Sequence, residues 1–425
     1  MAKKKQITAD SLPLVAIDLG SGSIRAMAAE RTEQGELRIL GVEESSKFLC
    51  VEQGRVTQTS NAGYMISETL RYLANRIGAK DLPTAFVCLG GRSMEIREVK
   101  DKRDQVRKKI VTQDLLDEME HGCREKIETH NPTVAVLGLV PIFYVLDGEE
   151  MEETPIGKAA IMVEVHYTAF VAKRENGVQL EKSFDQSGKS IEASFVRQEA
   201  LLSAFVETDG ARVLRRGCAV LDLGAQTTTL SVCKGTNYLF TKVIPQGGYH
   251  ITQVISAQGL PFAIAEKIKR KYGCAAPKWL QRNFKIGIPA TDESESLTFT
   301  SVELSEWIDS KLNEILSPLM NELKRYEERI ETLYITGGGA MLQGIRDYIQ
   351  ERTRLEVIYG SHERVLNEMT PEQYYEPTYS SLVGTLLLGT DYRDQHPGKV
   401  VTSGIRQKIE EFVVDLFSEQ DKETI

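Results

Sequence analysis

Two stretches of the chain repeat one pattern of apolar and polar positions. In Val15–Glu30 and in Cys218–Cys233, a β-rich apolar run is followed by Asp-Leu-Gly, by small and hydroxyl residues, and by a second strand-like run. Each stretch predicts two strands joined by a glycine-containing turn, and a third strand pattern follows each. The repeat, with Asp18 and Asp222 at equivalent places, indicates two related halves.

Longer periodic patterns predict helices. Apolar residues at helical spacing predict them over Asn61–Ala79, over Ser190–Val206, and over a long stretch that contains Pro318, where we expect a kink or break. The segment Thr84–Glu164 combines strand and helix patterns and indicates a small inserted αβ module. Within it, the dense charge of Arg97–Lys109 is typical of a solvated loop or an edge.

Length and composition exclude several classes of protein. A chain of 425 residues is too long for one hydrophobic core, so two or more domains are expected. The net charge of −9 argues against nonspecific nucleic-acid binding, and no apolar run is long enough to span a bilayer. The basic start lacks an apolar segment, which predicts a disordered tail rather than a secretory signal. The six cysteines lie apart without paired spacing, which indicates neither a zinc site nor a disulfide framework.

The two Asp-Leu-Gly turns suggest phosphate chemistry. Glycine lets the backbone approach a ligand closely, and the N–H groups of such a turn can cradle phosphate oxygens. An aspartate at the end of the preceding strand can hold the water shell of Mg²⁺. Two such hairpins, one from each half, can grip a triphosphate from both sides.

Two later motifs fit the same interpretation. Gly337–Gly339 let the backbone lie flat against a purine or ribose, although such a run is also common in plain turns. Glu266 and Lys269 lie on one helix face and can offer a carboxylate to ribose hydroxyls, although alone the pair is more typical of a solvated ion pair. The order and spacing of all four motifs predict a nucleotide clamp.

In this order, the motifs resemble the superfamily of actin, sugar kinases and heat-shock chaperones, and most closely the FtsA family of bacterial cell-division proteins. The resemblance runs from Leu14 to Phe417 and rests on segments such as "LVAIDLGSGSIRA", "DLPTAFVCLGGRSME", "AEKIKRKYG", "LYITGGGAMLQGI" and "EPTYSSLVGTLLLG". The insert at about 84–165 stands where this family has its subdomain IC, whereas actin and the chaperones carry their insert elsewhere in the chain.

The resemblance implies an α/β, actin-like two-lobed fold of duplicated ribonuclease-H-like domains with an inserted subdomain. The boundaries that it implies are 1–12 for a disordered N-terminus, 13–84 with 166–198 and 377–391 for subdomain IA, 85–165 for subdomain IC, 199–235 with 300–376 for subdomain IIA, 236–299 for subdomain IIB, 392–402 for a linker, 403–417 for an amphipathic membrane-targeting helix, and 418–425 for a tail.

The resemblance also implies a function. FtsA-like proteins bind ATP with Mg²⁺, polymerise head to tail, and recruit the C-terminal peptide of the tubulin-like FtsZ. They contact other division proteins and attach to the cytoplasmic face of the cell membrane at the division site through a C-terminal amphipathic helix. No nucleic-acid partner is expected, and enzymatic activity is at most a slow ATPase.

The resemblance assigns residues to four parts of a nucleotide site and to one partner contact. These are Asp18, Gly20, Ser21 and Gly22 in a first phosphate loop; Asp222, Gly224, Ala225, Gln226 and Thr227 in a second; Gly337, Gly338 and Gly339 in an adenosine loop; Glu266 and Lys269 on a ribose-facing helix; and Lys311 facing the acidic FtsZ tail. Asp18 and Asp222 are expected to hold Mg²⁺ through water. The second loop departs from the family's Asp-x-Gly-Gly-Gly-Thr, because Ala225 and Gln226 place Cβ atoms where a phosphate approaches, and this argues against hydrolysis.

The C-terminal segment has an amphipathic pattern of its own. Its apolar residues fall on one helix face: Ile405, Ile409, Phe412, Val413, Leu416 and Phe417. From Gly404 to Ile425 there are three basic and six acidic side chains, so a single tail is expected to bind an anionic bilayer weakly. The alternative is a helix that docks on the protein's own core.

Other functions of the same fold are considered beside this one. A sugar kinase or an exopolyphosphatase needs a catalytic acid or base and a substrate pocket, and the spacing identifies neither. A pilus-assembly actin-like protein shares the insert. A chaperone needs a peptide-binding domain, for which the residues after Gly389 are too few.

Overall fold

The computed structural model describes residues 12–92, 94–209, 216–235, 237–289 and 296–396. The expected amphipathic helix at 403–417, the tail after it, most of the linker before it, and residues 1–11 lie outside the described residues.

The first lobe is built on a five-stranded sheet with the strand order β11-β6-β1-β2-β3. β6 is parallel to β1 and to β11, whereas β1, β2 and β3 follow one another antiparallel. Because side chains alternate between the two faces of a strand, Val15 and Ile17 pack with α1 and α3, while Leu14 and Ala16 pack with α10. Its elements are β1 Leu14–Leu19, β2 Ile24–Arg31, β3 Leu37–Ser45, β4 Val51–Glu52, β5 Arg55–Val56, α1 Thr59–Ile77, β6 Thr84–Leu89, α3 Arg174–Ser187, β11 Ser190–Val196 and α10 Ser380–Gln395.

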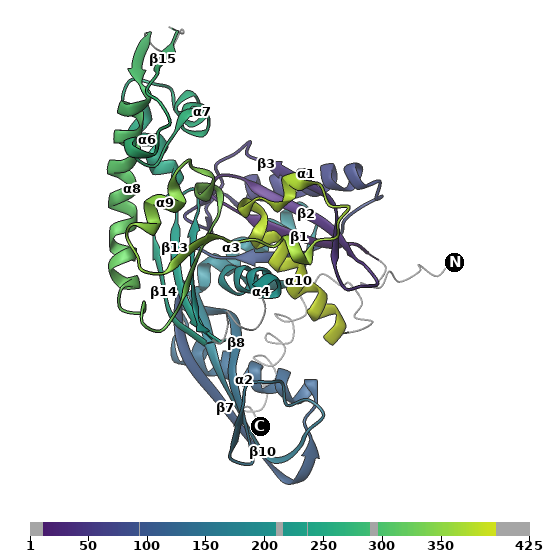
Figure 1. Cartoon of the computed structure of the whole chain (residues 1–425). Coiled ribbons are helices and arrows are strands. Elements are labelled where there is room, and N and C mark those ends of the chain that lie inside the picture. Colours follow the sequence, from purple (N-terminus) through teal and green to yellow (C-terminus); the bar gives the residue numbers. More distant parts are fainter. Residues whose placement is uncertain (1–11, 93, 210–215, 236, 290–295, 397–425) are drawn as a thin grey trace, which may run out of the picture.

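The second lobe repeats this plan with the strand order β14-β13-β12-β17-β18, which is the first order read from its other end. Leu221 packs with α8 on one face, and Val220 packs with Phe205 of α4 on the other. Figure 1 shows α8 along the outer side of this lobe and α4 between the lobes. The elements are α4 Arg197–Asp209, β12 Cys218–Leu223, β13 Thr228–Lys234, β14 Asn237–Ile244, α6 Gly248–Ser256, α7 Phe262–Tyr272, η2 Pro277–Trp279, β15 Lys285–Ile288, β16 Leu297–Thr300, α8 Ser301–Leu323, β17 Thr332–Thr336, η3 Gly338–Met341, α9 Ile345–Gln350, β18 Glu356–Tyr359, η4 Glu363–Val365, η5 Glu372–Tyr375 and η6 Pro377–Tyr379.

A four-stranded sheet with the order β7-β10-β8-β9 extends away from the two lobes and carries α2 on one face (Figure 1). Its bounds are β7 Glu95–Ile110, α2 Gln113–His130, β8 Val134–Leu146, β9 Glu149–Met151 and β10 Ala159–Lys173. The charged segment Arg97–Lys109 lies in the edge strand β7, as expected for an edge. The strand β6, which the sequence suggested as the start of the inserted module, belongs to the first sheet, so the inserted sheet starts at Glu95.

Two sequence-based predictions of helices were wrong. Ser190–Val206 is a strand up to Val196 and a helix only from Arg197, because β11 pairs in parallel with β6, a long-range contact that no local pattern reveals. The helix α8 continues unbroken through Pro318, so the expected break is absent there. Burial of Leu312, Leu316 and Leu319 on one side of α8 stabilises the helix across the proline.

Candidate functional site between the two lobes

The two Asp-Leu-Gly hairpins have the same geometry. In the first, Leu19 pairs with Ile24 across a turn of residues 20–23; in the second, Leu223 pairs with Thr228 across a turn of residues 224–227. The turns meet between the lobes, because a Cβ atom added to Gly22 would lie 3.1 Å from the Cβ of Ala225. The structure therefore brings the two predicted phosphate loops together.

An arginine that the sequence analysis missed lies between the two aspartates. Arg197 begins α4 directly after β11, and two of its nitrogens form a bidentate ion pair with the Asp18 carboxylate, with Nη1 3.0 Å from Oδ2. Its Nε lies 3.9 Å from Oδ2 of Asp222. The guanidinium thus links an aspartate of each lobe.

This cluster is largely shielded from solvent, which strengthens its electrostatics. Burial opposes the charge of Arg197, but attraction to Asp18 and Asp222 outweighs it and raises the pKa of Arg197 above its ordinary value. Burial raises the pKa of Asp222, and the Asp18 charge adds to this effect against the opposing Arg197. The Ser381 hydroxyl donates to Oδ2 of Asp18 at 3.2 Å. The donor set therefore does not fit the divalent cation that the sequence suggested, since a guanidinium already holds the Asp18 oxygens and approaches Asp222.

Polar groups of both turns are engaged by a third turn of the chain. The backbone N–H of Gln53 donates to Oε1 of Gln226 at 2.9 Å, and the N–H of Gly54 donates to the Ser21 hydroxyl at 3.1 Å. Gln53 adopts a φ of 50°, which is uncommon for a residue with a side chain. The turn between β4 and β5 therefore bridges the two lobes, and the Gln226 side chain is part of that bridge.

The three glycines of the predicted adenosine loop differ in their surroundings. A Cβ at Gly337 would lie 2.5 Å from Oδ1 of Asp222, and a Cβ at Gly339 would lie 2.7 Å from Cβ of Leu223, so both positions require glycine. A Cβ at Gly338 would meet nothing within 4 Å. The loop therefore packs tightly on β12 at its two ends and leaves open space at its centre.

Glu266 and Lys269 form an ion pair that is tied to the second hairpin. Nζ of Lys269 lies 2.6 Å from Oε2 of Glu266 and donates to the carbonyl of Gly248 at 2.8 Å, while the Gly248 N–H donates to the carbonyl of Gly224. Burial alone would raise the pKa of Glu266, but the Lys269 charge and hydrogen bonds from Lys269, Thr252 and Arg270 lower it to about 2. The pair is thus half-buried and connected to the second hairpin.

Lys311 is linked to the second hairpin through Glu314, which accepts from the side chain of Gln246, whose carbonyl in turn accepts from the Thr228 hydroxyl. It is on α8, its side chain is 17% exposed, and its Nζ lies 2.6 Å from Oε2 of Glu314. Its predicted contact with an acidic peptide stays a prediction. Among the described helices, none has the length and hydropathy to cross a membrane.

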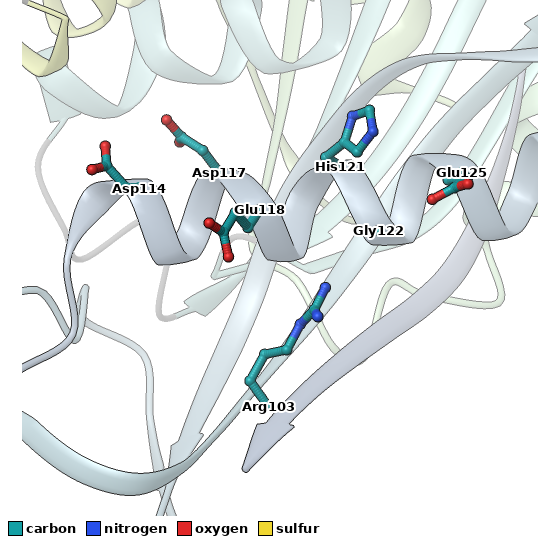
Figure 2. Close-up of a pocket in the computed structure, with 7 residues that line it drawn as sticks. All are labelled: Arg103, Asp114, Asp117, Glu118, His121, Gly122 and Glu125. Carbon is teal, nitrogen blue, oxygen red and sulfur yellow. The ribbon is translucent and has the colours of Figure 1, made fainter. Parts of the chain in front are cut away.

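A separate hollow of about 600 Å³ lies on the inserted sheet rather than between the lobes (Figure 2). Figure 2 shows Arg103 reaching towards α2, which carries Asp114, Asp117, Glu118, His121 and Glu125 along this hollow. With four carboxylates against one arginine, the hollow repels phosphate groups, so the paired hairpins remain the candidate site.

Comparisons with known proteins agree with this geometry. A family model described as "Cell division protein FtsA" matches residues 219–384. The cell division protein FtsA of Helicobacter pylori is 25% identical over 405 residues, covering 88% of this chain and 81% of that protein. The protein of the same name from Escherichia coli K12 is 22% identical over 395 residues, covering 89% of this chain and 90% of that protein.

Two solved structures share the fold. The PilM-PilN type IV pilus biogenesis complex matches with a TM-score of 0.63 and 17% identity, covering 89% of this chain and 98% of that chain. MreB5 of Spiroplasma citri bound to ADP matches with a TM-score of 0.52 and 12% identity, covering 92% of this chain and 100% of that chain. The predicted actin-like α/β fold is confirmed, and the chain is similar to FtsA cell-division proteins along most of its length.

Proposed function

We propose that the chain binds ATP between its two Asp-Leu-Gly hairpins, polymerises, and links FtsZ filaments to the cytoplasmic membrane at the division site. The observation that carries the nucleotide part is the equal register of the two hairpins, whose turns meet between the lobes. Backbone N–H groups in turns of this kind are suited to phosphate oxygens. The structure of MreB5 bound to ADP supports the proposal, because it shows an actin-like protein that holds an adenine nucleotide.

The proposal gives each part of the site a role. Gly20, Ser21 and Gly22 face the phosphates from the first lobe, and Gly224 to Thr227 face them from the second. Gly338 lies against the adenosine, where the structure has open space, and Glu266 meets the ribose with Lys269 beside it. For phosphates to enter between the turns, Gln53 and Gly54 must release Gln226 and Ser21. ATP binding is therefore coupled to a change at the bridge between the lobes.

The partner contacts are proposed from the family. The C-terminal residues Ile405, Ile409, Phe412, Val413, Leu416 and Phe417 insert into the inner membrane surface, and Lys311 contributes to binding of the FtsZ C-terminal peptide. Because the tail is net acidic, one copy binds weakly, and polymerisation supplies the avidity by placing many tails along one bilayer. Turnover of ATP is slow, because Ala225 lies where the two turns meet.

Calorimetric titration with ATP tests the nucleotide site. Gly338→Asp should abolish binding, because it places a charged side chain in the open space of the adenosine loop. Gly287→Asp is the matched control, since Gly287 lies on β15 with no atom within 4 Å of its Cβ position. Undetectable binding of ATP by the unmodified chain, or equal loss in both variants, would contradict the proposal.

Co-sedimentation with liposomes tests the tether. Binding should rise steeply with protein concentration, and Phe412→Glu combined with Leu416→Glu should release the protein, because lipid tails cannot pair buried charges. Strong binding by dilute protein that this double variant does not weaken would rule out the avidity mechanism.

A further inference from the structure

We infer that Arg197 takes the place of a divalent cation between Asp18 and Asp222, so that this chain assembles its nucleotide site without Mg²⁺. The statement about Arg197 and the two aspartates stands on the structure alone. The consequence for the nucleotide rests on the proposed binding of ATP.

The position of Arg197 is set by the fold. In the first sheet, Asp18 of β1 is opposite Cys88 of β6, and Cys88 is opposite Phe195 of β11. These strands are parallel, so their carboxyl ends lie at one edge of the sheet. Arg197 follows Phe195 by two residues and therefore leaves the sheet at the edge where Asp18 lies near the end of β1. Asp222 reaches the same point from the second lobe.

The surroundings of Arg197 leave room for its side chain. A Cβ atom added to Gly90 would lie 3.1 Å from Nε of Arg197 and 3.6 Å from its Cβ and Cδ. Because Gly90 has no side chain, the arginine side chain can pass close to the backbone at this position. The Cys88 thiol, whose pKa burial raises to about 12, is neutral at this place and adds no competing charge.

The chemistry of the group fits the role. A divalent cation between two carboxylates neutralises them and fixes their relative position, and a guanidinium can do both with a planar, permanently charged set of donors. Arg197 holds Asp18 through two nitrogens and faces Asp222 with a third. In the described residues, no group of three or more His, Cys, Asp or Glu side chains is arranged to hold a metal ion. The positive charge that joins the two halves is therefore supplied by the side chain of Arg197.

Removal of the guanidinium should create the metal site that it replaces. In Arg197→Gln, the two aspartates face each other without a charge between them, and oxygen ligands of this kind favour Mg²⁺. We expect this variant to melt at a lower temperature than the unmodified chain in EDTA, and Mg²⁺ to raise its melting temperature by several degrees. Mg²⁺ should leave the melting temperature of the unmodified chain unchanged.

The control variant is Arg216→Ala, which removes an exposed arginine paired with Glu331. It should respond to Mg²⁺ as the unmodified chain does. If Arg197→Gln does not fold, Arg197→Lys keeps a positive charge but not the three-point contact, and it should show a smaller Mg²⁺ response in the same direction. A melting temperature of the unmodified chain that rises with Mg²⁺, or the absence of any Mg²⁺ response in both Arg197 variants, overturns the inference.

Titration with ATP separates this inference from the proposed function. The unmodified chain should bind ATP equally well in Mg²⁺ and in EDTA, whereas Arg197→Gln should bind at least about tenfold more tightly with Mg²⁺. Binding by the unmodified chain in Mg²⁺ alone would overturn the inference and leave the nucleotide site standing. No binding under either condition would contradict the proposed function, and the melting experiments without nucleotide would still decide the role of Arg197.

Discussion

The two halves of this molecule share a strand order and a hairpin register, yet the loops that follow the equivalent strands β6 and β17 differ. A side chain occupies the space beside the loop after β6, whereas the space beside the loop after β17 is open. Gly90 follows Cys88, the partner of Asp18, by two residues, and Gly338 follows Thr336, the partner of Asp222, by two residues. The Gly90 position faces Arg197 at 3.1 Å, whereas the Gly338 position has no atom within 4 Å.

The difference shows how a duplicated fold acquires a single site. The space next to the first hairpin is occupied by Arg197 and by the turn that contains Gln53 and Gly54. Next to the second hairpin, the Gly338 position is open, and the half-buried pair of Glu266 and Lys269 lies on that side. Symmetry of the backbone brings the hairpins together, and side chains outside the repeat leave open space for an adenosine beside Gly338 but not beside Gly90.

The largest expected effect distinguishes the two aspartates. Asp18→Asn removes the bidentate partner of an arginine that is largely shielded from solvent and should lower the free energy of unfolding by about 3–5 kcal/mol. Asp222→Asn should lower it by less than about 1 kcal/mol, because Asp222 lies 3.9 Å from Arg197 and burial already raises its pKa. Urea denaturation of both variants measures this, and equal losses would show that the cluster is symmetric.

The two loops should also respond differently to a side chain. Gly90→Val should lower the free energy of unfolding by about 1–3 kcal/mol, because the added methyl groups meet Arg197. Gly338→Val should change it by less than about 0.5 kcal/mol and should weaken ATP binding instead. Thermal melting combined with ATP titration of both variants measures this difference. A lower melting temperature for Gly338→Val than for Gly90→Val would contradict the prediction.

Two carboxyl groups whose pKa values are shifted in opposite directions, Glu199 and Glu266, should give opposite pH dependences. Burial on α4 raises the pKa of Glu199 to about 8 from 4.5, so its proton is held in the folded state and stability is lost as pH rises from about 4.5 through about 8. The pKa of Glu266 is lowered to about 2, so its contribution is present above about 4.5 and is lost as pH falls towards about 2.

Glu199→Gln should therefore remove the loss of stability between about pH 4.5 and about pH 8, with a slope of at most about 1.4 kcal/mol per pH unit, and leave the loss below about pH 4.5 unchanged. Glu266→Gln should flatten the acid side alone. Melting temperatures recorded across pH for both variants test the signs, and a Glu199→Gln curve that coincides with the parent curve would show that this carboxyl ionises normally.

The smallest effect concerns the bridge between the lobes. Gln226→Ala removes the acceptor of the Gln53 N–H and should lower the free energy of unfolding by about 1 kcal/mol. Because the same bond must open for phosphates to enter, the variant should bind ATP more tightly. Weaker binding would indicate that Gln226 contacts the nucleotide rather than restraining the lobes.

Much of the fold could be predicted from sequence, because the repeated Asp-Leu-Gly pattern predicts both the strands and the tight turn of each hairpin. The feature that the sequence hid is Arg197. A local pattern extends one helix over Ser190–Val206, and only the parallel pairing of β11 with β6 ends the strand at Val196 and directs the next residue to Asp18. The Gln53 turn was hidden for a similar reason, since β4 and β5 have two residues each and give no periodic signal.

The central claim is that both hairpins hold one nucleotide, and calorimetric titration with ATP tests it through one variant in each half. Gly22→Val should fill the space between the turns that phosphates need, because a Cβ at Gly22 would lie 3.1 Å from the Cβ of Ala225, and Gly338→Asp should fill the adenosine loop. The account predicts one ATP per chain and loss of binding in either variant. More than one ATP per chain, or full binding in either variant, would contradict it.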